Sequence, residues 1–454
     1  MSFIGIDLGA TFIKGAILDS ELGQVRNIHR IPFPPFSRKE GYIRECDTDK
    51  ILASVVSILD TLLSLDPNCN GLVMCGQMHG LVMCDSFGQA VSPFISWQDQ
   101  RSLLPSSDRG KTWYELLCQR LEGVDFRLLG NELRPGLPLT HLFYLNQIHE
   151  LPPNSFPASL MDFILANLCS STPIAEATNA EAHGFYNVSR GKWDLDIIKR
   201  LELGQLLLPE IVPIGTKCGF LQYKGKNIIC YTSIGDQQAA LLGSGLSFRE
   251  LSLNISTGSQ VSLRSHEFEI GEFQTRPYFD GNYLKTITHL PAGRALNALI
   301  RMFIEFSPEK SIEDPNIWSY LDEQVGKTKQ TDIKIALTFF NGALGEKGYI
   351  SHIRESELTI GHLFRAAFES MAENYYLCAC RLSDQFAWDT LLFSGGLVKK
   401  TTNLQRIIAN RFNGIPIRLN SSEEDTLIGL QIMAHSIIHN SSLEQSSQKI
   451  LTKT

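Results

Sequence analysis

The opening of the chain alternates between apolar and other residues in two short runs. Residues 3–8 and 12–18 show the two-residue period of a half-buried strand, and the small residues at 9–11 predict a tight turn between them. Apolar residues then recur at helical spacing over 47–65, and a short apolar run follows at 71–75. A strand, a helix and another strand in this order predict an α/β fold.

The same pattern restarts near the middle of the chain. Residues 251–261 form a strand, a small-residue turn and a second strand, in parallel with residues 4–14. An internal repeat of this length predicts two similar α/β domains that face one cleft, with boundaries at 1–246 and 247–454, although a coincidental similarity stays open at this point. The polar tail from about Asn440 is expected to be frayed.

Composition and charge narrow the class of protein. The 454 residues are 43% hydrophobic with a formal net charge of −7, which excludes wholesale disorder and gives no electrostatic footprint for nucleic acid or an anionic membrane. No run of about 18 apolar residues predicts a membrane span, and the first residues lack a signal-peptide pattern. The ten cysteines contain no CxxC pair, which fits a reducing compartment, so we expect a cytoplasmic protein. The charge and the lack of a long apolar run lead us to expect neither nucleic-acid nor membrane partners. Neither a GxSxG nor a GxxxxGK[ST] motif is present, which argues against an α/β-hydrolase and a P-loop kinase.

The first turn combines residue types that suit a phosphate group. Small residues such as Gly9 let backbone N–H groups approach a phosphate closely, and Lys14 could neutralise its charge. Asp7 ends the first strand and could hold a hydrated Mg²⁺, because magnesium prefers carboxylates and keeps several waters. The alternative is an ordinary hairpin with a polar turn.

Two further glycine turns follow predicted strands. One is the small-residue turn at 256–259, and the other is Gly395-Gly396 after the apolar run at 390–394. A strand, glycine turn and helix in sequence can present backbone groups to a nucleotide. Each turn alone could be an ordinary tight loop, but three together favour a nucleotide site.

Asp236 follows a short predicted strand at 228–232 and precedes a helix of small residues. One interpretation is that it only caps that helix. The other is that it acts as a general base at the helix N-terminus and accepts a hydroxyl proton during phosphoryl transfer.

Two polar clusters follow strands in the first half, at 77–80 and 97–101. A Trp face with Asp, Arg and His nearby offers a sugar an apolar plane and directional hydrogen bonds. The alternative is that His79 and Trp97 are ordinary core residues.

Taken in order, these motifs resemble the FGGY family of carbohydrate kinases from Ile4 to about His435. The stretches that carry the resemblance are DLG at 7–9, GQMHG at 76–80, SWQDQR at 96–101, GDQQAA at 235–240, STGS at 256–259, HLFRAAFE at 362–369, SGG at 394–396 and EDTLIGL at 424–430. Within the family the chain is most similar to the sedoheptulokinase branch, for example at NISTGSQ (254–260) and PYFDGNYL (277–284), although xylulokinases also carry a GQMHG-like stretch.

The resemblance implies two actin-like, ribonuclease H-like ATPase domains and a kinase that uses ATP and Mg²⁺. The first domain would bind sugar and carry the base, and the second would bind ATP. The reaction would transfer the γ-phosphate to the terminal primary hydroxyl of a ketose. Sedoheptulose is the best candidate, and xylulose or another pentulose is the alternative.

The resemblance also implies roles for individual residues. The catalytic base would be Asp236, and Mg²⁺ would be held by Asp7 through water. The residues implied in sugar binding are Met78, His79, Trp97, Asp99, Arg101 and Gln237. Those implied in ATP binding are Gly9, Thr11, Lys14, Thr257, Gly258, Gly293, Asn297, Gly395 and Gly396.

The chain departs from the family pattern at three positions. Ala10 stands where the family usually has Thr, which removes a hydroxyl from the phosphate turn, while His141 and Tyr144 replace Lys and Trp. Actin-like folds also include chaperone ATPases, filaments and sugar-sensing regulators that phosphorylate no sugar. A filament or chaperone would not need the sugar-binding set, and a regulator is disfavoured because we find no DNA-binding segment or basic tail. The expected partners are the sugar substrate and ATP. A homodimer is also expected, because family members often form dimers.

Overall fold

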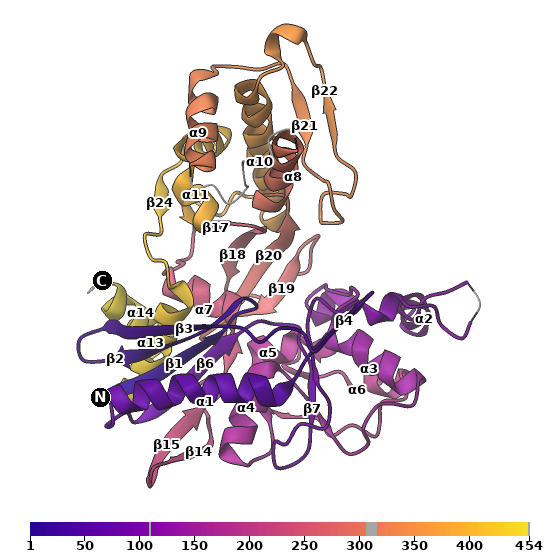
Figure 1. Ribbon diagram of the computed structural model, residues 1–454, viewed down its shortest axis with the longest axis vertical. Helices are drawn as coiled ribbons and strands as arrows, with labels where there is room; N and C mark the ends of the chain where they lie inside the picture. The colour runs from indigo at the N-terminus through magenta and orange to yellow at the C-terminus, as the bar shows by residue number, and fades with distance from the viewer. Residues whose placement is uncertain (109, 306–315, 453–454) are drawn as a thin grey trace. The chain divides into compact units, whose positions relative to one another are not determined.

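The computed structural model describes residues 1–108, 110–305 and 316–452, and it contains two compact units (Figure 1). Each unit has its own central sheet and its own hydrophobic core. Unit 1 comprises Met1–Gly245, Arg276–Tyr283 and Glu423–Thr454, and unit 2 comprises Leu246–Thr275 and Leu284–Ser422.

These packing units differ in part from the predicted domains 1–246 and 247–454. The first break lies between Gly245 and Leu246, next to the predicted boundary. The C-terminal segment that starts at Glu423 nevertheless packs with unit 1. The assignment of sugar binding and ATP binding to the two predicted domains stays a prediction.

The sheet of unit 1 is built around the predicted hairpin. β1 pairs antiparallel with β2 and parallel with β6, and β16 pairs parallel with the end of β6. β1 and β6 are buried along nearly their whole length, as expected for parallel strands covered on both faces. The strands in spatial order are β14 (Lys217–Tyr223), β15 (Lys226–Tyr231), β6 (Gly71–Gly76), β1 (Ser2–Leu8), β2 (Phe12–Asp19) and β3 (Gln24–Pro32), with β16 (Ile234–Gly235) beside β6.

The helix predicted over 47–65 is α1 (Thr48–Leu65), which covers β2 and β3 (Figure 1). Its buried face contains Ile51, Val55, Ile58 and Leu62, and each such side chain contributes roughly 1.5–3 kcal/mol of burial free energy. The side chain of Asp47 caps its first turn. The other helices of unit 1 before the chain leaves it are α2 (Trp113–Arg120), α3 (Pro138–Gln147), α4 (Leu160–Cys169), α5 (Ala177–Glu181), α6 (Leu195–Arg200) and α7 (Asp236–Gly243).

The sheet of unit 2 repeats the opening of unit 1. β17 pairs antiparallel with β18 across the turn at 256–259 and parallel with β23, just as β1 pairs with β2 and β6. The predicted internal repeat and the mixed α/β architecture are therefore confirmed. The strands in spatial order are β19 (Gln274–Pro277), β20 (Tyr283–Leu290), β18 (Ser259–Ser265), β17 (Glu250–Ile255), β23 (Thr390–Ser394) and β24 (Ile417–Leu419).

Unit 2 packs its helices around one large apolar core. The long helix α10 buries Phe364, Phe368, Met371 and Tyr375 in this core. The helices are α8 (Gly293–Ile304), α9 (Ile317–Lys327), α10 (Ile360–Leu382), α11 (Gly396–Lys400) and α12 (Thr402–Arg411), with a hairpin of β21 (Lys334–Ala336) and β22 (Tyr349–Ser351). No helix in the described ranges is long and apolar enough to cross a membrane.

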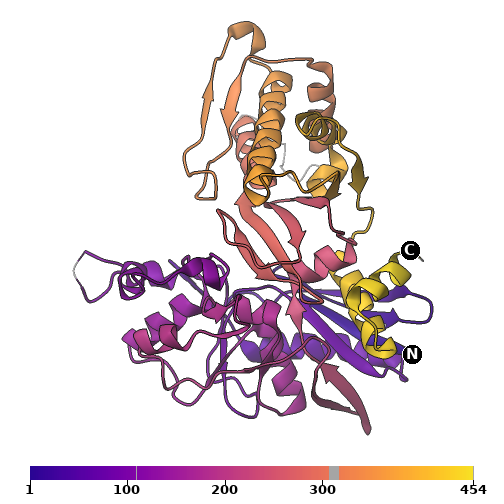
Figure 2. The same ribbon diagram turned by 180° about the vertical axis from the view of Figure 1, so that it is seen from behind.

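The prediction of a frayed tail from about Asn440 is wrong. After α13 (Asp425–His439), the chain forms a second helix, α14 (Leu443–Leu451), which packs against α13 (Figure 2). Leu443 and Ile450 are seven residues apart, so they share one helical face and are both buried. The polar composition hid this face, and the carboxylate of Asp280 accepts from the first backbone N–H groups of α14.

α13 packs closely on α7, the helix that begins at Asp236. A Cβ on Gly429 would lie 2.0 Å from the carbonyl oxygen of Ala239, and one on Gly243 would lie 1.9 Å from that of Asp425. No real Cβ contact is this short, so the helix pair depends on glycine at both positions. The position of α7 in unit 1 is thereby fixed by α13.

We predict that Gly429→Ala destabilises the protein by roughly 2 kcal/mol or more, because the added methyl group overpacks the α7–α13 contact. Thermal unfolding should show a Tm lowered by at least about 4 °C. Gly204→Ala is the matched control, because a Cβ there meets no atom within 4 Å. Equal Tm values for the two variants would contradict the account.

Candidate active site

The carboxyl ends of three parallel strands meet at one edge of the unit 1 sheet. Asp7 on β1 lies beside Cys75 on β6, and Gly235 on β16 lies beside Gly76 on β6. In parallel α/β sheets, ligands bind beyond this edge. The segments that leave the strands there are 9–11, 77–80 and 236–243.

Asp236 is the first residue of α7 and is half-buried. Its Oδ1 accepts a hydrogen bond from the Gln237 backbone N at 2.8 Å. Burial and the negative charge of Asp7 raise the pKa of Asp236 to about 7, and the positive charge of Arg276 opposes this rise. A carboxyl group with such a pKa can accept a proton near neutral pH.

Asp7 is buried at the end of β1, and its Oδ2 accepts from Thr426 Oγ1 on α13 at 2.7 Å. Burial raises the pKa of Asp7, while the Thr426 hydrogen bond and the charge of Lys14 lower it. Lys14 is opposite Asp7 in the β1–β2 register, and its Nζ lies 2.9 Å from Glu424 Oε2. The predicted phosphate-binding lysine is therefore also an ion-pair partner of Glu424, which Arg30 contacts as well.

The turn at 9–11 joins Asp7 to β2. Thr11 is exposed, and its carbonyl accepts from the Phe33 backbone N at 2.9 Å. A Cβ on Gly9 would lie 3.0 Å from the Phe12 carbonyl oxygen, so a side chain at Gly9 would be crowded. The turn thus keeps small residues close to the carboxyl edge.

The donor set at this edge fits a hydrated Mg²⁺. No group of three or more His, Cys, Asp or Glu residues that could hold a metal ion occurs in the part of the chain that is described. Mg²⁺ does not need one, because it commonly binds through one or two carboxylates with waters and substrate phosphates. Asp7 supplies such a carboxylate, and its charge already raises the pKa of Asp236, so a cation here would offset a local excess of negative charge.

The turn after β6 places Met78 against Gly235, the residue before Asp236. A Cβ on Gly235 would lie 3.0 Å from Met78 Sδ, so the Met78 side chain packs closely on this residue. His79 has a φ of 67°, a left-handed conformation that costs energy in a residue other than glycine. Burial lowers the pKa of His79 to about 4, and its Nε2 lies 3.5 Å from Glu132 Oε2. The imidazole is thus neutral at neutral pH.

Two charged residues that the sequence analysis missed complete this region. Arg276 is buried, and its guanidinium donates to Gln237 Oε1 at 2.5 Å, to Glu132 Oε2 at 2.9 Å and to Met78 Sδ at 3.9 Å. Glu132 is also buried and accepts from Arg134 Nε at 2.7 Å. No motif or spacing pointed to them, because they are 144 positions apart in the sequence.

Asp99 and Arg101 bind each other and the backbone around them. Asp99 has no exposed surface, and it accepts from Arg101 Nε at 2.9 Å, from Arg101 Nη2 at 2.8 Å and from the Arg44 backbone N at 2.6 Å. Arg101 also pairs with Glu45 at 2.6 Å. Both residues fix the loop after β8 (Phe94–Ile95), where Trp97 is partly exposed. Their predicted contact with sugar stays a prediction.

In unit 2, the predicted nucleotide residues meet at the β17–β18 turn. Thr257 and Gly258 are exposed there. The Gly293 backbone N donates to the Ser256 carbonyl at 3.0 Å, and the Arg294 backbone N donates to the Thr257 carbonyl at 2.8 Å. A Cβ on Gly293 would lie 2.7 Å from the Ser256 carbonyl oxygen. The start of α8 is therefore fixed against this turn.

The loop after β23 joins the same region of unit 2. Gly395 has a φ of 96°, and a Cβ there would lie 2.4 Å from the Ile255 carbonyl oxygen, so only glycine fits. Gly396 has open space at its Cβ position. Asn297 on α8 has a buried Oδ1 without a hydrogen-bond partner among the described residues. A buried acceptor of this kind suits a donor from a ligand.

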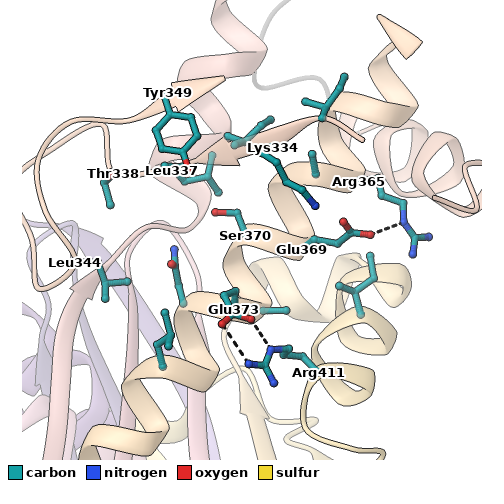
Figure 3. Close-up of a pocket in the computed structure, with 18 of the residues that line it drawn as sticks. Lys334, Leu337, Thr338, Leu344, Tyr349, Arg365, Glu369, Ser370, Glu373 and Arg411 are labelled. Atoms are coloured by element: carbon teal, nitrogen blue, oxygen red, sulfur yellow. Dashed lines mark hydrogen bonds and ion pairs between the residues drawn. The ribbon is translucent and has the colours of Figure 1, made fainter. Parts of the chain in front are cut away.

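A separate cavity of about 1000 Å³ opens in unit 2 between α10, α12 and the β21–β22 hairpin (Figure 3). Arg365 and Glu369 form an ion pair in its wall at 2.9 Å, and Glu373 pairs with Arg411. The residues that line it do not include the predicted nucleotide residues of unit 2. We assign this cavity no part in the candidate active site.

Comparison with known proteins agrees with the resemblance. Models of the N-terminal and C-terminal domains of the FGGY family of carbohydrate kinases match residues 2–243 and 347–436. The chain therefore belongs to the FGGY family of carbohydrate kinases. As a member it is an ATP-dependent sugar phosphotransferase, which confirms the predicted class of enzyme.

The sequence identity between this chain and individual relatives is low. Sedoheptulokinase from Mus musculus is 24% identical over 427 residues, which cover 82% of this chain and 84% of the relative. Xylulose kinase from Lactococcus lactis subsp. lactis is 25% identical over 311 residues, which cover 65% of this chain and 60% of the relative. The crystal structure of Plasmodium falciparum glycerol kinase with ADP has a TM-score of 0.82 at 16% identity and covers 99% of this chain and 92% of that chain. This likeness confirms the actin-like ATPase fold.

Buried acids support the strand that precedes Asp236. Thr178 Oγ1 accepts from the Gly235 backbone N at 3.0 Å and donates to Glu176 Oε2 at 2.5 Å. Asp162 accepts from Ser233 Oγ at 2.6 Å. Burial raises the pKa of Glu176 and of Asp162 to about 7 each. The carboxyl groups of Glu176 and Asp162 are thus mainly protonated in mildly acidic solution.

We predict that Glu176→Gln removes a pH-dependent loss of stability. In the unfolded chain Glu176 ionises above its ordinary value of 4.5, whereas the folded protein keeps it protonated up to about pH 7. Wild-type stability contributed by this group is therefore present below pH 4.5 and lost as the pH rises to about 7. Relative to wild type, the variant should gain roughly 3 kcal/mol across this window.

Urea unfolding at several pH values measures this difference. Gln keeps an acceptor for Thr178, so the variant isolates the titration from the hydrogen bond. Parallel stability curves for the two proteins between pH 4.5 and 7 would contradict the burial argument.

Proposed function

We propose that this chain phosphorylates the terminal primary hydroxyl of a ketose, and that sedoheptulose is the substrate and sedoheptulose 7-phosphate the product. The observation that carries the proposal is the carboxyl edge of unit 1, where Asp236 has a pKa of about 7 and lies beside Met78 and Gln237. The similarity to a sedoheptulokinase over most of both chains supports the choice of sugar.

In the proposed reaction, Asp236 accepts the proton of the attacking hydroxyl as its oxygen bonds to the γ-phosphorus of ATP. The bond between that phosphorus and the β,γ-bridging oxygen breaks, and ADP leaves. Because Asp236 has a raised pKa, it is basic enough to take the proton and is still substantially ionised near neutral pH. The neutral imidazole of His79 can donate or accept a hydrogen bond to a sugar hydroxyl.

The proposed phosphate contacts come from backbone and lysine groups. In unit 1 these are the turn containing Gly9 and Thr11, together with Lys14. In unit 2 they are the turn of Thr257 and Gly258. Mg²⁺ held by Asp7 through water would neutralise phosphate charge when bound. Gly293, Asn297, Gly395 and Gly396 would hold the rest of the nucleotide.

A pentulose such as xylulose is the second candidate, because a xylulose kinase matches the chain at similar identity over a shorter stretch. The experiment that separates the candidates is sugar-dependent ADP release by the pure protein with ATP and Mg²⁺. The panel contains sedoheptulose, xylulose, ribulose, glycerol and gluconate. Highest kcat/KM with sedoheptulose supports the proposal, and preference for a pentulose replaces it with the alternative. ATP binding without sugar-stimulated turnover would contradict both.

We predict that Asp236→Ala lowers kcat by roughly 10²–10⁴-fold, the usual contribution of a general base. The loss should fall on turnover because ATP contacts come from other residues, so calorimetry should show an ATP Kd within a few-fold of wild type. Asp49→Ala is the control, because Asp49 is also an aspartate in the first turn of a unit 1 helix but is exposed. Near-normal turnover of Asp236→Ala would remove the base from the mechanism.

A further inference from the structure

A buried ion pair contacts three of the predicted sugar-binding residues. Arg276 donates to Gln237 Oε1 at 2.5 Å and to Met78 Sδ at 3.9 Å, while Glu132 lies 3.5 Å from His79 Nε2. Arg276 and Glu132 bind each other at 2.9 Å, and both are almost completely buried. The Arg276–Glu132 pair thus contacts Met78, His79 and Gln237.

The charges of this group are fixed by its own contacts. Burial alone would raise the pKa of Glu132, but the hydrogen-bonding contact of His79 and the charges of Arg276 and Arg134 hold it well below its usual range. Burial likewise opposes the charge on Arg276, and Glu132 raises the pKa of that guanidinium. With His79 neutral, Glu132 is an anion between two guanidinium groups, since Arg134 Nε also binds it at 2.7 Å.

We infer that Arg276 and Glu132 form a specificity-determining pair: Arg276 positions the Gln237 and Met78 side chains, and Glu132 balances its charge so that the site selects uncharged sugars over sugar acids. This inference rests on the proposed function and narrows its substrate class. Arg276 acts through Gln237 and Met78, so it is a positioning residue.

The physical reason is the balance of charge around the sugar. A buried guanidinium without a partner would attract the carboxylate of a sugar acid strongly, because charges interact more strongly away from water. Glu132 removes most of that attraction, and the nearby carboxylate of Asp236 repels an acidic substrate. A neutral ketose meets none of this repulsion, and it finds the hydrogen-bonding groups of His79 and Gln237 already oriented.

Glu181 is a second carboxyl group beside the pair and must be included in any test. It is buried, and its Oε2 has no hydrogen-bond partner among the described residues. Burial and the charge of Glu132 raise the pKa of Glu181, while Arg276 lowers it. If Glu132 loses its charge, Glu181 can ionise and balance Arg276 in its place. Only the double variant removes both of these carboxyl groups, after which the charge of Asp236 still acts on Arg276.

The experiment compares kcat/KM for sedoheptulose and for gluconate in full-length variants. Glu132→Gln should raise the gluconate-to-sedoheptulose ratio slightly, and Glu132→Gln/Glu181→Gln should raise it at least about tenfold. Adding Arg276→Met to the double variant should return the ratio to within about threefold of wild type, because the attracting charge is then gone. A ratio that does not move in the double variant, or that stays high in the triple variant, overturns the inference.

Arg276→Met alone tests positioning. The KM for sedoheptulose should rise roughly tenfold, while the KM for ATP stays within about twofold, and Arg276→Lys should recover part of the loss. A general structural defect would instead change both KM values or the Tm of the protein. Glu132 keeps Arg134 as a partner in this variant, which limits the cost to folding.

Glu250→Gln is the matched control. Glu250 binds Arg418 through two contacts of 2.7 Å in unit 2, so the variant breaks a similar pair away from the sugar-binding residues. It should leave the sugar ratio unchanged, and a shift as large as that of the double variant would contradict the inference. Wild-type protein without any sugar-dependent ADP release refutes the proposed function itself. Normal wild-type turnover with an unmoved ratio refutes only this inference.

Discussion

Parallel pairing of β1, β6 and β16 brings Asp7 and Asp236 to one edge of the unit 1 sheet. Neither carboxyl group is well solvated there, and the charge of Asp7 raises the pKa of Asp236. The surrounding structure maintains this arrangement: α13 fixes α7 through Gly429, and Thr426 binds Asp7. Two buried carboxyl groups that repel each other in this way have a shifted pKa, which is typical of functional sites.

Two buried carboxyl groups support the strand that precedes Asp236. Glu176 binds Thr178, which accepts from the Gly235 backbone N, and Asp162 binds Ser233, so both acids position the strand that precedes Asp236. Their raised pKa values mean that they support the strand mainly as neutral hydrogen-bonding groups below neutral pH. The charged pair of Arg276 and Glu132 contacts Gln237, the residue after Asp236. Charged groups thus lie next to Asp236, whereas the acids that support the preceding strand are mainly neutral below neutral pH.

Local patterns were enough to predict the first hairpin, α1, β6 and the internal repeat, because each depends on alternation or helical spacing within one segment. Asp236 and the small-residue turns were found for the same reason. Arg276 and Glu132 were not, because their pairing depends on how the segment 276–283 returns to unit 1. α14 was not predicted because its buried face has few apolar residues. The hydrogen bonds that Asp99 makes to Arg101 could not be read from the local pattern, and its predicted contact with sugar stays a prediction.

The central claim is that the sheet edge makes Asp236 a base through burial and through Asp7. Its most direct test is a ¹³C NMR titration of carboxyl-labelled aspartate in wild type, Asp7→Asn and Asp236→Asn, the last of which identifies the Asp236 resonance. The account predicts a pKa of about 7 for Asp236 and a lower value in Asp7→Asn, because the repelling charge is gone. A pKa near the ordinary 3.8 in wild type, or a value that ignores the Asp7 substitution, would contradict it.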